Sequence, residues 1–268
     1  MEAAPPILRH KDHRAPSVFT PEALLRESRR QKGINAIGVP EICILDPDGD
    51  IVRHLLAANR VRRLPQWACY HTELYGLDHA GLCYGIVGFA VGAAFAVLVA
   101  EELFASGCKL LLSMTSAGQI APIQAPPYFI IIDRALRDEG TSYHYLPPSD
   151  YSAADERLME LAKQALAVAG LPTLVGPTWT TDAPFRETCG AITAAQADGI
   201  FAVEMEAAAL YAFAAARQKQ VLCLAHVTNQ MGAHEGDFEK GVADGAEESL
   251  RIVSAIVGMW RRSAGHIA

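Results

Sequence analysis

The sequence lacks the cysteine pattern of a disulfide-bonded or zinc-binding protein. It has six cysteines in 268 residues, with no C-x-x-C pair and no cluster of His and Cys at the spacing of zinc ligands. We therefore expect buried, reduced thiols in a cytoplasmic protein that uses no metal and no other cofactor.

Charged residues are also scarce, because they make up 20% of the chain, and the formal net charge is -7. That balance excludes the basic surface on which nucleic-acid binding depends.

Long uncharged segments are rare as well. Residues 1–16 contain charges and prolines but no apolar core, so they do not resemble a secretory signal. Residues 80–100 are uncharged and long enough to cross a bilayer. Gly85, Gly88 and Gly92 interrupt this segment, and two glutamates follow it at once. We interpret it as a buried strand, a glycine turn and a buried helix, and we expect no membrane span.

Hydrophobic residues, in contrast, are abundant at 51% of the chain, which is enough for a generous core. Short apolar runs alternate with segments of helical periodicity. The strands are predicted at residues 37–45, 64–73, 81–87, 109–114, 129–133, 171–179 and 221–227. The helices are predicted at residues 21–31, 51–59, 92–106, 155–169, 205–217 and 247–259. The alternation predicts an α/β fold with a mainly parallel or mixed sheet.

The organisation of the chain follows from the same pattern. No internal repeat or linker separates the predicted elements. We expect a polar N-terminal surface segment over residues 1–36 and one domain over residues 37–268. Thr20 is expected to cap the first helix, with Pro21 at its first position. Turns are expected at residues 76–79 and 115–118.

Three loops follow predicted strands, at residues 46–50, 115–118 and 228–236. In α/β sheets, ligands bind where loops leave the carboxyl ends of strands, so we expect the site at these loops.

A further candidate is a pair of acidic residues. Glu204 and Glu206 flank Met205 where an apolar strand meets an Ala-rich helix. Buried carboxylates need partners, and the vicinal hydroxyls of a sugar would serve, with methionine as an apolar surface beside the sugar. The alternative is an acidic first helical turn that interacts with the helix dipole.

The segment V-E-M-E-A-A at residues 203–208 resembles a signature of the nucleoside phosphorylase family, which includes uridine phosphorylases, purine nucleoside phosphorylases and nucleosidases. Residues 137–145 and 181–187 resemble further family segments in the same order, and the resemblance covers roughly residues 40–260. It implies a single α/β domain with a mixed, barrel-like central sheet flanked by helices. It also implies cleavage of a nucleoside and a homo-oligomer, either a dimer or a hexamer built as a trimer of dimers.

The resemblance assigns roles to individual residues. Glu206 corresponds to the ribose-binding glutamate, with Glu204 beside it, and Met205 to the methionine that packs on the sugar. Phe185 would stack on the base and Arg186 would bind a base carbonyl. Neither His10 nor His13 aligns with the family's N-terminal histidine, so we expect neither to reach a site.

Asn229 stands where purine-specific members carry an aspartate that protonates the leaving base. An amide cannot act as that acid, but it offers a donor and an acceptor to a base edge. This suits uridine or a 6-oxopurine nucleoside better than a 6-aminopurine nucleoside. The alternative is that Asn229 only caps a turn.

The phosphate site departs from the family pattern, because Gly49 and Ser113 stand where phosphorolytic members carry arginines. Each lost contact to a dianion is worth about 1.5–3 kcal/mol. Hydroxyls and backbone N–H groups at five positions would have to cradle an oxyanion instead. These positions are Gly88, Ser113, Thr115, Ser116 and Gly118. Five arginines could substitute, including from a neighbouring subunit, and these are Arg53, Arg60, Arg62, Arg63 and Arg137.

The loop at residues 46–50 suggests a different reaction, hydrolysis. Asp46, Asp48 or Asp50 could activate a water molecule as a general base, as carboxylates of nucleosidases do. The alternative is an ordinary Asp-Pro-Asp-Gly turn. Three functions therefore stay open: phosphorolysis of a nucleoside with phosphate as co-substrate, hydrolysis, and nucleoside binding without catalysis. We rank phosphorolysis first because it is the commonest activity among the uridine phosphorylase-like sequences that this chain resembles.

Overall fold

The computed structural model describes residues 5–232 and 235–263, which contain a ten-stranded mixed sheet. The strands are β1 (Ile42–Asp46), β2 (Val61–Arg63), β3 (Tyr75–His79), β4 (Leu82–Gly88), β5 (Leu110–Gln119), β6 (Tyr128–Asp138), β7 (Tyr151–Ala153), β8 (Leu174–Thr181), β9 (Ala202–Glu204) and β10 (Gln220–Asn229). Because β10 pairs with both β5 and β6, strands β5, β10, β6, β8 and β9 close on themselves. The predicted mixed, barrel-like sheet in a single α/β domain is confirmed.

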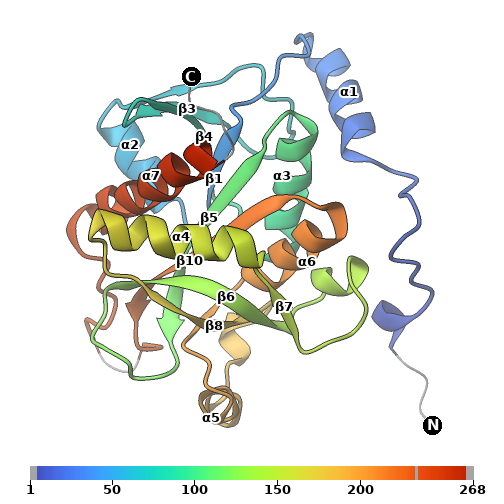
Figure 1. Cartoon of the computed structure of the whole chain (residues 1–268). Helices are drawn as coiled ribbons and strands as arrows, with labels where there is room; N and C mark the ends of the chain where they lie inside the picture. Colours follow the sequence, from blue (N-terminus) through green and yellow to red (C-terminus); the bar gives the residue numbers. More distant parts are fainter. Residues whose placement is uncertain (1–4, 233–234, 264–268) are drawn as a thin grey trace.

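Helices cover both faces of this sheet (Figure 1). They are α1 (Pro21–Lys32), α2 (Asp50–Ala57), α3 (Ala93–Ala105), α4 (Glu156–Ala169), α5 (Cys189–Ala197), α6 (Ala207–Arg217) and α7 (Ala246–Ser263). On one face α3 and α6 pack together, with α1 outside α3. On the other face α7 packs against α2 and α4, and α5 projects at the bottom of the view in Figure 1. Two large clusters of buried apolar side chains fill the two faces.

Several local predictions hold because they depend on neighbouring residues alone. Thr20 caps α1 by accepting a hydrogen bond from the N–H of Ala23 at 3.2 Å, and Pro21 opens the helix. Residues 80–100 contain all of β4, a turn and the first part of α3, as expected. Within the described part of the chain, no helix combines the length and apolar content needed to cross a bilayer.

Other predictions were wrong where long-range pairing decides the structure. The expected turn at residues 76–79 lies in β3, which pairs with β2 and β4, and the chain reverses at Ala80 and Gly81, both at positive φ. The expected turn at residues 115–118 lies inside β5, because β10 pairs with it in parallel as far as Gly118. Its small residues allow close packing, since a Cβ on Gly118 would lie 2.5 Å from the sulfur of Met231.

Errors in the predicted positions of strands also arise where long-range pairing decides the structure. Residues 64–73 form no strand, and the strand expected at 37–45 begins only at Ile42. The sequence also gave no signal for α5 or for the short strand β7. Both depend on contacts with distant parts of the chain, as β7 does by pairing with β6.

Tyr211 in α6 provides a test of how the helix is held on the sheet. Its hydroxyl donates to the carbonyl of Ile132 at 2.6 Å and accepts from the N–H of Cys223 at 3.0 Å, and the side chain is 1% exposed. Tyr211→Phe leaves both backbone groups buried without this partner, so we expect a loss of about 1–3 kcal/mol in the free energy of unfolding. Urea unfolding measures it. The matched control is Tyr70→Phe, which removes an exposed hydroxyl and should change stability by less than about 0.5 kcal/mol. Equal effects of the two changes would contradict this account.

Candidate active site

Strands β1, β4, β5 and β10 run parallel, so their carboxyl ends meet at one edge of the sheet. A cavity of about 410 Å³ lies at this edge, within the size range of ligand sites. Seven residues named from the sequence line it: Asp48, Ser116, Gly118, Phe185, Glu204, Met205 and Asn229. Six others do not line it: Asp46, Gly88, Ser113, Thr115, Arg186 and Glu206.

Glu204 holds the junction between the sheet and α6. One carboxylate oxygen accepts from the hydroxyls of Thr178 and Thr180, and the other accepts from the N–H groups of Glu206 and Ala207, both at 2.7 Å. Burial raises the pKa of Glu204, and these hydrogen bonds lower it. With both oxygens fully engaged by the protein, Glu204 positions the neighbouring residues of the cavity.

Glu206 is 2% exposed and does not line the cavity, and its carboxyl group contacts Gly92, just before α3, and Thr115 of β5. One oxygen accepts from the N–H of Gly92 at 2.7 Å, and the other lies 2.8 Å from the hydroxyl of Thr115. Burial, aided by the nearby charge of Glu204, raises the pKa of Glu206 to about 8. Thr115 is the donor to this second oxygen, and its hydroxyl oxygen also lies 3.2 Å from the carbonyl of Ser116.

The three aspartates of the first loop have different surroundings. Asp46 is 2% exposed and caps α2 by accepting from the N–H of Val52 at 2.8 Å, and burial raises its pKa to about 7. Asp50 forms ion pairs with Arg53 and Lys240. Asp48 lines the cavity, where one carboxylate oxygen accepts from the N–H of Ser116 at 2.8 Å. Of the three, Asp48 is therefore the one placed to meet a ligand in this cavity.

The two positions expected to hold arginines are closed to longer side chains. Gly49 has a φ of 77°, and a Cβ on it would lie 2.1 Å from the ring of Phe89. Ser113 is 1% exposed, and its hydroxyl has no hydrogen-bond partner among the described residues. The arginines considered as substitutes do not line the cavity within this chain. Several are held elsewhere: Arg53 by Asp50, Arg60 by Glu247, Arg63 by Glu73 and Arg137 by Ser142 and Ser149.

Asn229 ends β10 and takes part in a turn as well as in the cavity wall. Its side-chain oxygen accepts from the N–H of Met231 at 2.9 Å, and its amide nitrogen lies 3.2 Å from the hydroxyl of Thr228. The side chain is 9% exposed. The turn contact uses the amide oxygen, so the nitrogen is the better placed group for hydrogen bonding to a ligand.

Phe185 and Arg186 lie in the short helix η3 (Pro184–Arg186) beside the cavity. Phe185 is 98% exposed and lines the opening, whereas Arg186 is exposed and does not line it. Of the N-terminal histidines, His13 lies near the carbonyl of Tyr143, and neither His13 nor His10 lines the cavity of its own chain.

Sequence reasoning missed two residues in the loop after β10, Phe238 and Lys240. Asp237 folds this loop back by accepting hydrogen bonds from the N–H groups of Gln230 and Gly232. No pattern in the sequence marks these residues, because their position depends on that closure. Lys240 is the cation of the cavity wall, and its ammonium lies 2.6 Å from a carboxylate oxygen of Asp50. Among the described residues, no cluster of His, Cys, Asp and Glu has a geometry that could hold a metal ion.

Comparison with known proteins matches residues 42–258 to the family model described as the Phosphorylase superfamily. A curated relative, purine nucleoside phosphorylase DeoD-type 1 of Shewanella oneidensis, is 27% identical over 152 residues, which are 56% of this chain and 64% of that protein. Purine nucleoside phosphorylase DeoD-type of Streptococcus uberis is 26% identical over 159 residues, 59% of this chain and 67% of that protein. The matched segments thus span about two thirds of these relatives.

Two solved structures share the fold. Purine nucleoside phosphorylase from Toxoplasma gondii, in complex with immucillin-H, has a TM-score of 0.70 at 15% identity, over 84% of this chain and 93% of that one. Uridine phosphorylase from Vibrio fischeri has a TM-score of 0.65 at 18% identity, over 83% of this chain and 90% of that one. The likeness of backbones therefore extends well beyond the detectable likeness of sequences.

The raised pKa of Glu206 predicts a pH dependence of stability. Its pKa is about 8 in the folded chain and near the ordinary 4.5 in the unfolded chain, so between these values the folded state binds more protons. Its contribution is therefore full below about pH 4.5 and is lost as the pH rises toward about 8. Glu206→Gln imitates the neutral acid, since its amide donates to Thr115 and accepts from Gly92. We expect the free energy of unfolding of this variant to fall less between pH 5 and pH 8 than that of the wild type.

Urea midpoints at the two pH values measure the difference. Glu156→Gln, a change at an exposed glutamate, is the control and should follow the wild type. Parallel pH profiles for Glu206→Gln and the wild type would show that Glu206 is already ionised at neutral pH.

Proposed function

The chain belongs to the phosphorylase superfamily, and from this premise we propose that it cleaves the N-glycosidic bond of a nucleoside. The family resemblance of the V-E-M-E-A-A segment is confirmed by the match over residues 42–258. The observation that carries the proposal is the cavity at the carboxyl edge of the sheet. It brings together Met205, Phe185 and Asn229 from three separate parts of the chain. One apolar surface, one aromatic ring and one amide suit a sugar and a planar base.

The chemistry assigns a task to each of these residues. When the C1′–N bond breaks, its electron pair leaves with the base and the sugar becomes cationic. Met205 lies against the sugar, and Phe185 stacks on the base. The amide nitrogen of Asn229 donates to a carbonyl oxygen of the base, where negative charge develops. This arrangement favours uridine or a 6-oxopurine nucleoside as the substrate.

Phosphate is the first candidate for the nucleophile. The curated relatives are named purine nucleoside phosphorylases, and the cavity wall includes Ser116, Gly118 and the cation Lys240. A phosphate oxygen would form the new bond to C1′ as the base departs, giving a pentose 1-phosphate and the free base. The protein would then act as a pentosyltransferase in nucleoside salvage or catabolism.

Water is a second candidate, and one observation favours it. Asp48 lines the cavity with one carboxylate oxygen fixed on the N–H of Ser116, while no arginine of the described residues lines it. A carboxylate repels a phosphate dianion at short range, but it can accept a proton from water as the water attacks C1′. Lys240 is already paired with Asp50, which reduces its capacity to offset that repulsion.

The two nucleophiles differ in whether the release of free base requires phosphate. Purified protein is incubated with uridine, inosine and adenosine, with and without phosphate, and the free base is quantified. Release of base that requires phosphate would exclude hydrolysis, and release that is indifferent to phosphate would exclude phosphorolysis. Absence of release together with stabilisation by nucleosides would identify a binding protein and contradict the proposed catalysis.

Asp48→Asn separates the two mechanisms further, because the amide oxygen still accepts from Ser116. If phosphate attacks, removal of the negative charge should lower the KM for phosphate several-fold. If water attacks, loss of the general base should lower kcat about 100-fold or more. The control is Asp78→Asn, a change at an exposed residue outside the cavity, which should alter neither constant.

Thr115 is predicted to set how strongly the sugar is recognised. Its hydroxyl and the N–H of Gly92 already occupy the two oxygens of Glu206, so a ribose 2′-hydroxyl gains little by reaching that carboxyl group. We expect comparable kcat/KM for uridine and 2′-deoxyuridine, or for the corresponding pair of purine nucleosides. Thr115→Ala should raise the preference for the ribonucleoside about tenfold, which corresponds to about 1.4 kcal/mol. Thr115→Ser keeps the hydroxyl and should leave the ratio unchanged. A wild-type preference for ribose above about 100-fold would contradict this role.

A further inference from the structure

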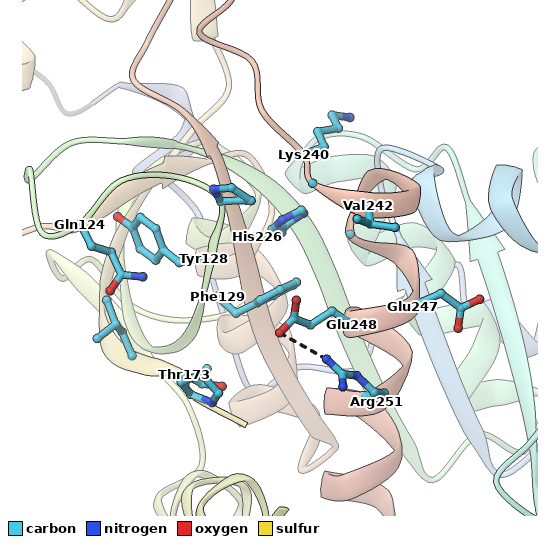
Figure 2. Close-up of a pocket in the computed structure, with 15 residues that line it drawn as sticks. Gln124, Tyr128, Phe129, Thr173, His226, Lys240, Val242, Glu247, Glu248 and Arg251 are labelled. Carbon is cyan, nitrogen blue, oxygen red and sulfur yellow. Dashed lines mark ion pairs between the residues drawn. The ribbon is translucent and has the colours of Figure 1, made fainter. Parts of the chain in front are cut away.

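A second cavity, of about 570 Å³, lies beside β10 and is larger than the candidate active site. One wall comes from β6 and β10, and the opposite wall comes from η4 (Val242–Gly245) and the first turns of α7. Figure 2 shows His226 and Phe129 on the sheet side, with Val242 and Glu248 across from them. None of the roles assigned above uses these residues. The cavity therefore calls for an explanation of its own.

The walls suit a flat molecule. His226 and Phe129 are paired across the antiparallel strands, and their rings stack with centroids 4.4 Å apart and planes inclined by 8°. Pro127 and Tyr128 also line the cavity, and Pro172 and Leu174 add apolar wall from β8 and the residues before it. Aromatic and apolar walls of this kind bind planar ring systems by stacking and by excluding water.

His226 supplies the polar recognition. The side chain is 4% exposed and lines the cavity. Burial lowers the pKa of His226 to about 4, and the charge of Lys240 adds to this effect, whereas Asp50 and Asp244 oppose it. The ring is therefore neutral at physiological pH and offers one N–H donor and one acceptor. The imidazole borders a space large enough for a ligand, so a ligand there can use this donor and this acceptor.

The charges around the cavity are already compensated within the chain. Glu248 lies 3.7 Å from Arg251, as the dashed line in Figure 2 marks, and Glu247 is bound by His54 and Arg60. Lys240 is bound by Asp50 at 2.6 Å. An ionic ligand would have to break one of these pairs, whereas an uncharged ligand leaves them intact. The cavity thus favours an uncharged molecule with donors and acceptors on its edge.

The backbone opposite His226 is shaped to this ring. A Cβ on Gly245 would lie 2.3 Å from the imidazole, so a side chain there would displace His226. Ala243 and Asp244 adopt left-handed conformations, with φ of 53° and 51°. Such conformations are unfavourable for residues other than glycine and are concentrated at functional sites.

We propose that this cavity is a second small-molecule site, which binds an uncharged planar heteroaromatic compound of the nucleobase class. The base stacks on the walls formed by the aromatic rings and prolines, and its edge exchanges hydrogen bonds with the imidazole of His226. The choice of a nucleobase, the product of the proposed reaction, rests on the proposed function. Lys240 lines both cavities, so a base bound here adjoins a cation of the active site and can inhibit as a product.

The test is the number of bases bound per chain. Equilibrium dialysis of the whole protein with uracil and with hypoxanthine should give two equivalents of one base at saturation. His226→Phe removes the hydrogen bonds and should reduce binding to one equivalent, and so should Val242→Trp, which blocks the opening from a residue that is 90% exposed. Asn229→Ala, in the candidate active site, should remove the other equivalent. Melting temperatures confirm that each variant is folded, and Val242→Trp keeps the test valid if His226→Phe unfolds.

The outcomes separate this proposal from the proposed function. Loss of one equivalent in Val242→Trp but no cleavage of any nucleoside would support the second site and contradict the proposed catalysis. Cleavage of nucleosides with a single equivalent of base, sensitive only to Asn229→Ala, would overturn the second site and leave the catalysis. Binding of no base would also overturn the second site.

Discussion

Two carboxyl groups buried two positions apart, on Glu204 and Glu206, determine how the elements around the candidate active site meet. An unpartnered carboxylate in such a place would cost several kcal/mol, so each oxygen must find donors. Glu204 finds them in β8 and in the backbone at the start of α6. Glu206 finds them at Gly92, just before α3, and in Thr115 of β5. Three strands and two helices are thereby fixed to one short segment, and Met205 between the two acids is held at the cavity wall.

The burial of these two carboxyl groups also determines which charges are present at the site. Burial and the charge of Glu204 raise the pKa of Glu206 to about 8, and this shift opposes the placement of two negative charges next to each other. The remaining carboxylate at the cavity wall near the first loop is Asp48, and the cation opposite it is Lys240. The ring of Phe89 covers Gly49, where the family resemblance places an arginine, and the guanidinium of Arg53 lies over this ring. In the proposed phosphorolysis, hydroxyls, backbone N–H groups and one lysine would hold the phosphate without an arginine.

The sequence predicted the features that are encoded locally. The cap at Thr20, the uncharged strand and helix of residues 80–100 and the V-E-M-E-A-A junction could all be recognised from neighbouring residues. Features that depend on distant pairing could not. Residues 115–118 look like a turn because they are small, yet β10 and β9 keep them in a strand. The contact of Thr115 with Glu206 joins residues that are 91 positions apart in the sequence. The position of Lys240 at the cavity depends on the loop that Asp237 closes and on Asp50, which is 190 positions away from Lys240.

The alternation of side chains along β10 explains how one strand serves two cavities. Leu224 belongs to the apolar cluster on one face of the sheet, and Ala225 and Val227 belong to the cluster on the other face. His226 shares the face of Leu224 and therefore meets α7 and the second cavity. The register between β10 and β5 shifts between Val227 and Asn229, and this irregularity lets both Thr228 and Asn229 reach the candidate active site. A displacement of β10 by a ligand on either side would thus move hydrogen-bonding groups on the other, because the imidazole and the amide belong to the same four residues of one strand.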